Sequence, residues 1–575
     1  MPLADRRTLP RLGIPLLVAV VAVAVGYALS VGLEGYFVYL GMSAVVAAIA
    51  LLGLGVVTGS AGMISLCQLT FAAVGAWVVS ALNKAEAPGG FLVWLLLGGL
   101  AAGVVGILVG LPALRLRGIN LAVVTLGLAA AADLTLVQLQ FPGVSEGISV
   151  MRPDAFSDDR AYFLLGVIVL VLCCLAVYFL RRGRWGSGWQ AVAFSERGTA
   201  AAGASVRTSK LTAFAVSATL GGISGGLLTG QVGLAFPASF TSIQSLALYV
   251  LAIMSGAHLI DMAVFGAVLW VAVPELLKRW GVPQDWGYVV FGLLGIQALT
   301  SGGNLGTALR EVWHRRARVR DGHVGIEHRE VEAVAEAPPP GDPVLVVRGL
   351  SVRFGHVDAL SSVDISVPEH GILGVIGPNG AGKSTLVDAI SGFLPQAQGT
   401  VELDGRPLTG SPTRRARAGL RRTFQQDRVP PGLTVEAYVR FVARRRLGAA
   451  EIADALEFFG CPSARTPLSR VDVGARRLVE VVGHLLAGPR ILLLDEPAAG
   501  LPHEEHVAFG ERLRRVPARF GVSLLLIEHD LDLVRSVCDT ITVLDFGQVL
   551  ATGPQAEVLA DPAVLKAYMG ETELL

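Results

Sequence analysis

One short loop carries the strongest chemical signal in the chain. Its residues are Gly377, Pro378, Asn379, Gly380, Ala381, Gly382, Lys383, Ser384 and Thr385. The loop fits the phosphate-binding pattern G-x-x-x-x-G-K-[ST]. Its glycines let backbone N–H groups converge on phosphate oxygens, and a following helix N-terminus adds a positive dipole. We expect Lys383 to reach the β- and γ-phosphates and Ser384 to coordinate Mg²⁺.

Two predicted elements position this loop. Residues 371–376 form an apolar run typical of a buried strand, and residues 384–391 are predicted to form a helix. A chance glycine-rich turn would not lie between such elements, so their presence favours a nucleotide site.

A second apolar strand, 491–495, ends in Asp495 and Glu496. It fits the Walker B pattern. Asp495 lies 495 − 383 = 112 residues after Lys383, and this spacing supports the assignment. We expect Asp495 to bind the metal and Glu496 to polarise the attacking water. A third buried strand, 524–528, leads to His529. Gln425 follows Phe424, and Phe354 precedes Gly355.

The N-terminal half differs sharply in character. The chain is 53% hydrophobic and 16% charged, whereas soluble proteins carry about 25% charged residues. Apolar runs occupy 13–33, 37–58, 66–82, 91–114, 119–139, 161–180, 211–231, 244–256, 262–277 and 287–300. Several approach the roughly 20 residues that cross a bilayer, which predicts eight to ten helices in contact with membrane lipid.

Charge and cysteine content exclude other classes. The net charge of +1 argues against nucleic-acid binding. The five cysteines show no paired C-x-x-C spacing, so buried thiols are favoured over a metal site or disulfides.

Basic clusters predict the orientation of the spans. They are Arg6/Arg7/Arg11, Arg115/Arg117, Arg181/Arg182/Arg184, Arg207/Lys210, Lys278/Arg279 and residues from Arg310 onward. The positive-inside rule places these and the N-terminus in the cytoplasm, with residues 86–90 and 154–159 outside. The first run resembles a signal peptide, but the spans that follow favour an uncleaved helix.

Composition also predicts the domain organisation. Residues 1–310 form a transmembrane domain. Residues 311–344, which include Pro338-Pro339-Pro340-Gly341, form a flexible linker, and residues 345–575 form an α/β domain.

Taken in order, the C-terminal motifs resemble the ATP-binding-cassette (ABC) ATPases over residues 345–575. The resemblance implies ATP and Mg²⁺ as cofactors, and catalytic roles for Glu496, His529 and Gln425. It implies that Phe354 stacks on adenine and that His529 contacts the γ-phosphate. Gln425 would join Ser384 and Asp495 at the metal and link this site to the membrane domain.

The family's signature, close to L-S-x-G-Q, aligns with residues 471–475. Gly474 is kept, but Asp472 replaces the serine and Ala475 the glutamine. In the family this loop caps the γ-phosphate bound by the partner ATPase, where a carboxylate would oppose phosphate by about 1–4 kcal/mol. Asp472 would also suit an N-cap of the helix from Gly474 onward. We therefore predict a weak site where this signature acts on the partner.

The membrane half resembles permeases for branched-chain amino acids. The similar segments are 52–66, 114–127, 184–203 and 274–277, and the ATPase continuation Ala498-Ala499-Gly500-Leu501 and ending 567–570 agree. The resemblance implies one half of an importer in the plasma (inner) membrane with a cytoplasmic ATPase, in which residues 195–203 couple the two domains. It also implies a second, non-identical half-transporter, an extracytoplasmic solute-binding protein and a small-molecule substrate.

Alternatives remain open at this point. The solute is a branched-chain amino acid, another amino acid, urea or a short amide. An ABC exporter and a membrane-tethered, non-transporting ATPase are less favoured, because the spans are short, numerous and joined by small loops. Polar residues in 60–70 and Thr125 interrupt apolar spans, which suits either a substrate pocket or interhelical hydrogen bonds.

Overall fold

The computed structural model describes residues 9–116, 118–301, 304, 306, 308, 341–499, 501 and 503–569. The chain divides into two compact units. The helical unit comprises Met1–Trp189 and Arg207–Arg320, and the α/β unit comprises Gln190–Val206 and Asp321–Leu575. Most of the predicted linker, together with Arg6, Arg7 and Arg117, lies outside the described residues. Strand β1 already begins at Pro343, inside the segment predicted as linker.

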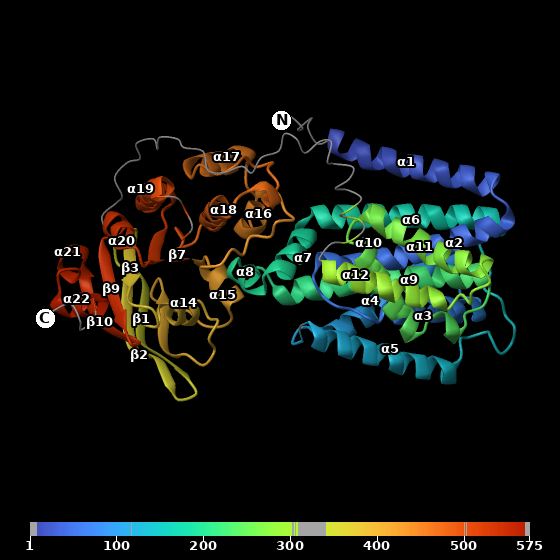
Figure 1. Cartoon of the computed structure of the whole chain (residues 1–575), viewed down its shortest axis with the longest axis horizontal. Helices are drawn as coiled ribbons and strands as arrows, with labels where there is room; N and C mark the ends of the chain where they lie inside the picture. The colour runs from blue at the N-terminus through green and yellow to red at the C-terminus, as the bar shows by residue number, and fades with distance from the viewer. Residues whose placement is uncertain are drawn as a thin grey trace. The chain divides into compact units, whose positions relative to one another are not determined.

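The helical unit consists of long apolar helices that lie alongside one another (Figure 1). They are α1 Leu9–Gly32, α2 Gly35–Leu54, α3 Gln68–Lys84, α4 Gly90–Ala113, α5 Ile119–Leu139, α6 Asp159–Arg182, α9 Val206–Val232, α10 Ser242–Ser255, α11 Ile260–Arg279 and α12 Trp286–Ser301. Helix α7, Arg184–Phe194, follows α6. Among the described residues, eight helical segments are long and apolar enough to cross a bilayer, within the predicted range. A helix satisfies its own backbone hydrogen bonds, as the bilayer requires.

Glycines bring α3 and α9 into close contact. A Cβ added at Gly225 would lie 1.8 Å from the Ala72 carbonyl oxygen, and one added at Gly75 would lie 2.1 Å from that of Gly222. Glycine at these positions permits the two helix backbones to approach closely.

The structure contradicts the prediction that Lys278 and Arg279 lie on the same side as Arg181. At one end of the helical unit, the Arg181 guanidinium donates to the His258 carbonyl, just before α11 begins. The other end of α11 carries Glu275, which accepts a 2.7 Å hydrogen bond from Tyr36 at the start of α2. A 20-residue helix is about 30 Å long. Lys278 and Arg279 therefore lie at the opposite end from Arg181 and cannot share its side of the membrane.

We call the end that carries Tyr36 the Tyr36 end. Residues 154–159 also lie there, because Asp159 begins α6 and Arg181 lies at the other end of that helix. Arg152 pairs with Asp159 at 2.8 Å, and Asn83 at the end of α3 accepts from the Met151 N–H at 2.9 Å, which brings the start of the 86–90 segment to the same end. The basic residues at the end of α11 were misleading on their own. The direction in which a helix runs through the bundle, and not charge alone, determines the end at which its last residues lie.

The α/β unit contains two sheets. The first has the order β2-β1-β4-β5, and the second has the order β10-β9-β3-β8-β7-β6. The strands are β1 Pro343–Phe354, β2 Val357–Pro368, β3 Ile372–Ile376, β4 Gln398–Leu403, β5 Arg406–Pro407, β6 Leu420–Arg422, β7 Ile491–Asp495, β8 Ser523–Ile527, β9 Thr540–Asp545 and β10 Gln548–Pro554. Strands β3, β7 and β8 are fully buried, as their uninterrupted apolar sequences predict.

Helices flank these sheets (Figure 1). They are α14 Lys383–Ile390, α15 Pro412–Ala418, α16 Val435–Ala443, α17 Ala449–Phe458, α18 Val473–Leu485, α19 His503–Phe520, α20 Leu531–Val537, α21 Gln555–Val558 and α22 Pro562–Met569. The predicted helix after the phosphate-binding loop is confirmed, with its start at Lys383.

The short helix α8, Glu196–Ala201, lies in Gln190–Val206, a segment of the α/β unit that interrupts the helical unit in sequence. Arg417 on α15 donates to the Gly203 carbonyl at 2.9 Å, and Thr413 donates to that of Ala204 at 3.3 Å. The segment predicted to couple the domains therefore contacts α15 of the α/β unit (Figure 1).

Candidate functional site

The order of the parallel strands gathers the predicted site residues. Strand β8 lies between β3 and β7, and β6 adjoins β7. In register, Val375 lies opposite Ile527, which lies opposite Asp495. The phosphate-binding loop, His529, Glu496 and Gln425 all follow the carboxyl ends of these strands. Ligands of open α/β sheets bind at this edge.

The phosphate-binding loop needs its glycines for conformation and for space. Gly377, Gly380 and Gly382 have φ values of 153°, 86° and 102°, in the region that favours glycine. A Cβ at Gly377 would lie 2.1 Å from the Leu544 carbonyl oxygen. Both constraints explain the glycine spacing.

Lys383 begins α14 and folds back over the loop. Its Nζ donates to the carbonyls of Gly377 at 2.7 Å and Pro378 at 2.9 Å. Burial lowers the pKa of this amine, whereas the carboxylates of Glu496 and Asp495 act in the opposite direction. The ammonium is thus held at the mouth of the loop, where phosphate oxygens would compete with the two carbonyls. Ser384, on the next position of α14, is exposed.

The two acids after β7 have different environments. Asp495 is 4% exposed and its Oδ2 accepts from Arg422 Nη2 at 3.0 Å. Burial raises the pKa of Asp495, and Arg422 counteracts this effect. Glu496 instead accepts a 2.7 Å hydrogen bond from Gln425 Nε2, and its φ of 47° lies in the left-handed region. This backbone geometry directs the two consecutive carboxylates to different partners.

The structure brings Gln425 to Glu496 and places His529 one residue beyond a buried acid. Glu528 accepts from the backbone N–H groups of Ala498 at 3.3 Å and His529 at 3.2 Å. Burial raises the pKa of Glu528. The His529 side chain is 64% exposed and therefore accessible to a ligand.

Phe354 ends β1 and pairs with Val357 across a tight hairpin. It is 46% exposed, which is unusual for phenylalanine and suits a stacking surface.

Asp472 caps α18, which confirms the predicted N-cap role. Its Oδ1 accepts from the Ala475 N–H at 2.7 Å, and the helix begins at Val473. A Cβ at Gly474 would lie 2.7 Å from Leu501 Cδ2, so the retained glycine also relieves crowding.

Sequence analysis missed two arginines that make contacts at the site. Arg477 donates to the Gln425 carbonyl at 2.5 Å and to the Ala499 carbonyl, which ties the Gln425 segment to the segment after β7. Arg422 joins Asp495 to Asp388. The pair Arg421-Arg422 before Thr423 was visible in the sequence, but nothing local identified the acids it would meet.

The donor atoms at this edge fit Mg²⁺. Ser384, Asp495 and Gln425 offer hydroxyl, carboxylate and amide oxygens, the hard ligands that Mg²⁺ prefers. Within the described residues, no group of three or more His, Cys, Asp or Glu side chains forms a separate metal cluster. A magnesium ion that shares its coordination with phosphates and water needs few protein ligands.

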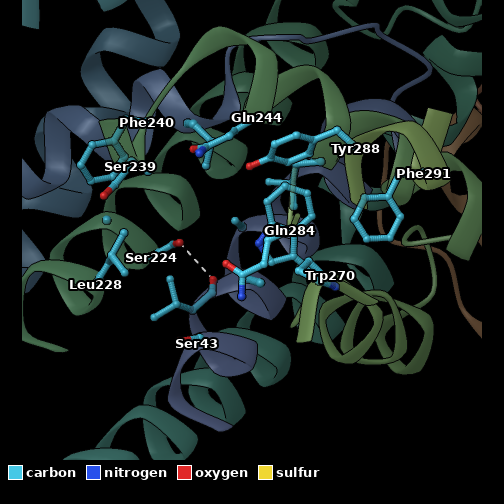
Figure 2. Close-up of a pocket in the computed structure, with 18 of the residues that line it drawn as sticks. Ser43, Ser224, Leu228, Ser239, Phe240, Gln244, Trp270, Gln284, Tyr288 and Phe291 are labelled. Carbon is cyan, nitrogen blue, oxygen red and sulfur yellow. Dashed lines mark hydrogen bonds between the residues drawn. The ribbon is translucent and has the colours of Figure 1, made fainter. Parts of the chain in front are cut away.

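A second candidate site lies inside the helical unit (Figure 2). It is a cavity of about 330 Å³ between α2, α9, α10, α11 and α12. Ser43, Ser224, Gln244, Gln284 and Tyr288 contribute polar groups. The apolar wall includes Val46, Leu228, Phe240, Leu248, Trp270 and Phe291. Ser224 is bonded to the Val46 carbonyl at 3.0 Å, and the Tyr288 hydroxyl forms a hydrogen bond with the Gln244 side chain at the cavity wall.

This cavity lies near the Tyr36 end. Gln284 and Asp285 belong to the connection between α11 and α12, which follows Arg279. Ser239 and Phe240 belong to the connection between α9 and α10.

The predicted lining around residues 60–70 has a mainly structural role. From this segment, Leu69 lines the cavity and Thr70 lines a separate apolar one. Gln68 Nε2 donates to the carbonyls of Ala50 and Ser217, and Thr125 accepts from the Leu66 N–H at 3.1 Å. Interhelical hydrogen bonding, one of the two interpretations of these polar residues, is the one observed.

Comparisons with known proteins match both units. Residues 36–299 match the family "Branched-chain amino acid transport system / permease component". Residues 360–499 match "ABC transporter", and residues 548–573 match "Branched-chain amino acid ATP-binding cassette transporter".

Individual relatives resemble the C-terminal part. The high-affinity branched-chain amino acid transport ATP-binding protein BraF of Pseudomonas aeruginosa is 34% identical over 251 residues, covering 40% of this chain and 98% of BraF. LivG of Salmonella typhimurium, with the same description, is 35% identical with the same coverage. A crystal structure of an ABC transporter's ATP-binding cassette in its ADP conformation is 29% identical, with a TM-score of 0.36, and covers 40% of this chain and 99% of its own.

Proposed function

Since the chain belongs to the branched-chain amino acid ABC transporters and joins their permease and ATP-binding parts, we propose that it is one half of an ATP-driven importer of branched-chain amino acids. The observation that carries this proposal is that both parts match the same transport system, at residues 36–299 and 548–573. The matches favour this function over an exporter and over uptake of urea or short amides.

The α/β unit supplies the ATPase. We propose that Phe354 stacks on adenine and that residues 377–385 hold the phosphates. Lys383 exchanges its two carbonyl partners for phosphate oxygens. When bound between Ser384, Gln425, Asp495 and the phosphates, Mg²⁺ would neutralise charge on the transferred group.

Hydrolysis requires a positioned water. The Glu496 carboxylate, oriented by the 2.7 Å bond from Gln425, polarises that water. The exposed His529 imidazole contacts the γ-phosphate and helps to hold the water in line.

The assembled transporter needs a second ATPase. In our proposal the partner is a non-identical half-transporter, because Gly474 and Asp472 face the phosphate that the partner binds and the carboxylate weakens that site. This chain's own loop, completed by the partner's signature, remains active.

Replacing Asp472 with serine tests this asymmetry. Serine also caps helices, so α18 should persist while the opposing charge is removed. We expect ATP turnover of the assembled complex to rise about two- to fivefold, which the lower end of the charge effect, about 1 kcal/mol, already permits. Asp472→Asn, which keeps a cap and removes the charge, should behave alike. Unchanged or slower turnover in both variants would contradict a charge effect.

The helical unit supplies the transport path. We propose that the chain lies in the plasma membrane with its ATPase in the cytoplasm. The Tyr36 end then faces outward, where an extracytoplasmic binding protein delivers substrate. The cavity of Figure 2 is near this end and combines aromatic and aliphatic walls with serine, amide and phenol groups. That mixture suits an amino acid with an apolar side chain.

Uptake of labelled leucine into vesicles tests the function. The complex of this chain with its partner half should transport leucine only with ATP on the ATPase side and a leucine-loaded binding protein on the other. ATP-dependent efflux without a binding protein would contradict import. Competition by urea but not by valine would contradict the substrate class.

Closing the cavity provides a more specific check. Ser239→Trp places a bulky side chain at the half-buried rim, and we expect leucine uptake to fall at least about tenfold while basal ATP hydrolysis persists. Ser157→Trp, at an exposed position of the same end, is the matched control. Equal uptake by both variants would exclude this cavity from the path.

A further inference from the structure

A chain of alternating charges connects α8 to the metal-binding aspartate. Arg197 on α8 donates through Nη2 to Asp388 Oδ1 at 2.5 Å. The Arg197 guanidinium also lies 4.6 Å from the Phe393 ring centre and 5.6 Å from that of Phe424. Its position is therefore held by an ion pair and by aromatic faces, which favour cations.

Asp388 is shared between two arginines. It lies on α14, five positions after Lys383, and the same oxygen that meets Arg197 also accepts from Arg422 Nη1. Arg422 Nη2 reaches Asp495 at 3.0 Å. One planar guanidinium thus bridges an acid that contacts α8 and an acid that we assign to the metal.

Burial makes this bridge sensitive to its surroundings. Arg422 and Asp495 are 3% and 4% exposed. Water screens charges weakly at such positions, so a change in the partners of Asp388 alters how strongly Arg422 is drawn toward Asp495. Arg197, whose side chain is 44% exposed, is the member of the chain that is free to shift with α8.

We propose that Arg197, Asp388 and Arg422 form an ionic relay through which the position of α8 controls how readily Asp495 binds the metal. This relay operates beside the Gln425–Glu496 contact and rests on the proposed transport function. While Arg197 neutralises Asp388, Arg422 remains on Asp495 and competes with the cation. When α8 withdraws Arg197, Asp388 draws Arg422 away and releases Asp495.

The same linkage runs in the opposite direction. A cation on Asp495 repels Arg422 toward Asp388, which weakens the hold of Asp388 on Arg197. Coupling free energies are reciprocal, so metal–nucleotide binding must loosen the contact of α8 to the same degree. In this way Arg197 acts as a positioning residue for a site that it does not touch.

Binding of Mn²⁺ tests the relay without measuring catalysis. Mn²⁺ is paramagnetic, so its free concentration can be followed by electron paramagnetic resonance on the purified full-length chain with ADP bound. We expect Arg197→Gln to tighten Mn²⁺ binding at least about fivefold, within the usual range of coupling. Asp388→Asn should weaken it, because Arg422 is then held by Asp495 alone.

The double variant isolates the path. If Arg197 acts only through Asp388, the variant that carries both substitutions should match Asp388→Asn. Arg348→Gln, which breaks an exposed 2.9 Å pair with Glu402, controls for loss of a surface ion pair. ADP affinity measured without metal should stay unchanged in every variant, which verifies folding.

Three results would overturn the relay. They are unchanged Mn²⁺ affinity in Arg197→Gln, additive effects in the double variant, and an equal effect of Arg348→Gln. None depends on the transported solute. Failure of leucine uptake with a normal Mn²⁺ response would instead reject the proposed substrate and leave the relay standing.

Discussion

Replacing Glu496 with glutamine is expected to slow ATP hydrolysis at least about 100-fold while ATP binding persists. Glutamine preserves the shape of the side chain but cannot polarise water as a carboxylate does. The backbone φ of 47° and the contact with Gln425 should tolerate it, since neither requires the charge. The measurements are steady-state phosphate release and retention of labelled ATP by the assembled complex.

A matched substitution shows whether this effect is specific to Glu496 or follows from removing any carboxylate of the α/β unit. Glu436→Gln removes a carboxylate that pairs with Arg440 at 3.0 Å on α16, outside the proposed site. It should leave the rate of ATP hydrolysis within about twofold of that of the unsubstituted protein, because exposed ion pairs on helices contribute only a few tenths of a kcal/mol to stability. If Glu496→Gln hydrolyses ATP as fast as Glu436→Gln, then Glu496 is not the catalytic residue and His529 becomes the candidate.

Lys383→Met should produce the second large effect, a loss of nucleotide binding itself. Methionine keeps the apolar stem that packs at the start of α14 but lacks the ammonium that the phosphates require. We expect ATP affinity to fall at least tenfold, equivalent to about 1.4 kcal/mol, and hydrolysis to become undetectable. Equilibrium binding of a fluorescent ATP analogue gives the first quantity.

Two controls define the meaning of that loss. Lys566→Met on α22 makes the same chemical change outside the proposed site and should bind ATP normally. The second control is thermal unfolding, because the ammonium also donates to Gly377 and Pro378 and its removal takes two hydrogen bonds from the loop. A variant that melts normally and still binds ATP with unchanged affinity would refute the role of Lys383.

Together, the two substitutions divide the ATPase cycle at a defined point. Lys383→Met should stop the cycle before ATP binds, and Glu496→Gln should stop it after ATP binds. If the transporter shares two unequal sites, each substitution in this chain should abolish most turnover, because the active loop is the one on this chain.

Much of the architecture could be predicted locally. The predicted strands at 371–376 and 491–495 contain β3 and β7, and the helix after the phosphate-binding loop is α14. Such elements follow from apolar runs and glycine positions, which depend on neighbouring residues alone. The N-cap role of Asp472 was predictable for the same reason, since its partner Ala475 is three residues away.

The errors arose where distant segments meet. Lys278 and Arg279 carry the charge that is typical of cytoplasmic loops, yet α11 runs so that they lie beside Tyr36 and Phe37. The polar residues at 60–70 left two interpretations open, and only the contacts of Gln68 with Ala50 and Ser217 decided for interhelical hydrogen bonding. In both cases the missing information was the identity of the helix on the other side.

The sequence by itself determined which chemical groups this protein has and what type of backbone carries each one. A motif such as residues 377–385 specifies a loop, its glycine conformations and its ligand, because all of these depend on short-range sterics. The tertiary structure decided which groups meet. Only the strand order β3-β8-β7-β6 and the packing of α8 bring Arg197, Asp388, Arg422 and Asp495 into one chain of charges. These residues are separated by up to 298 positions, 495 − 197, and electrostatic pairing at that separation depends on distance in space, about which local sequence patterns carry no information.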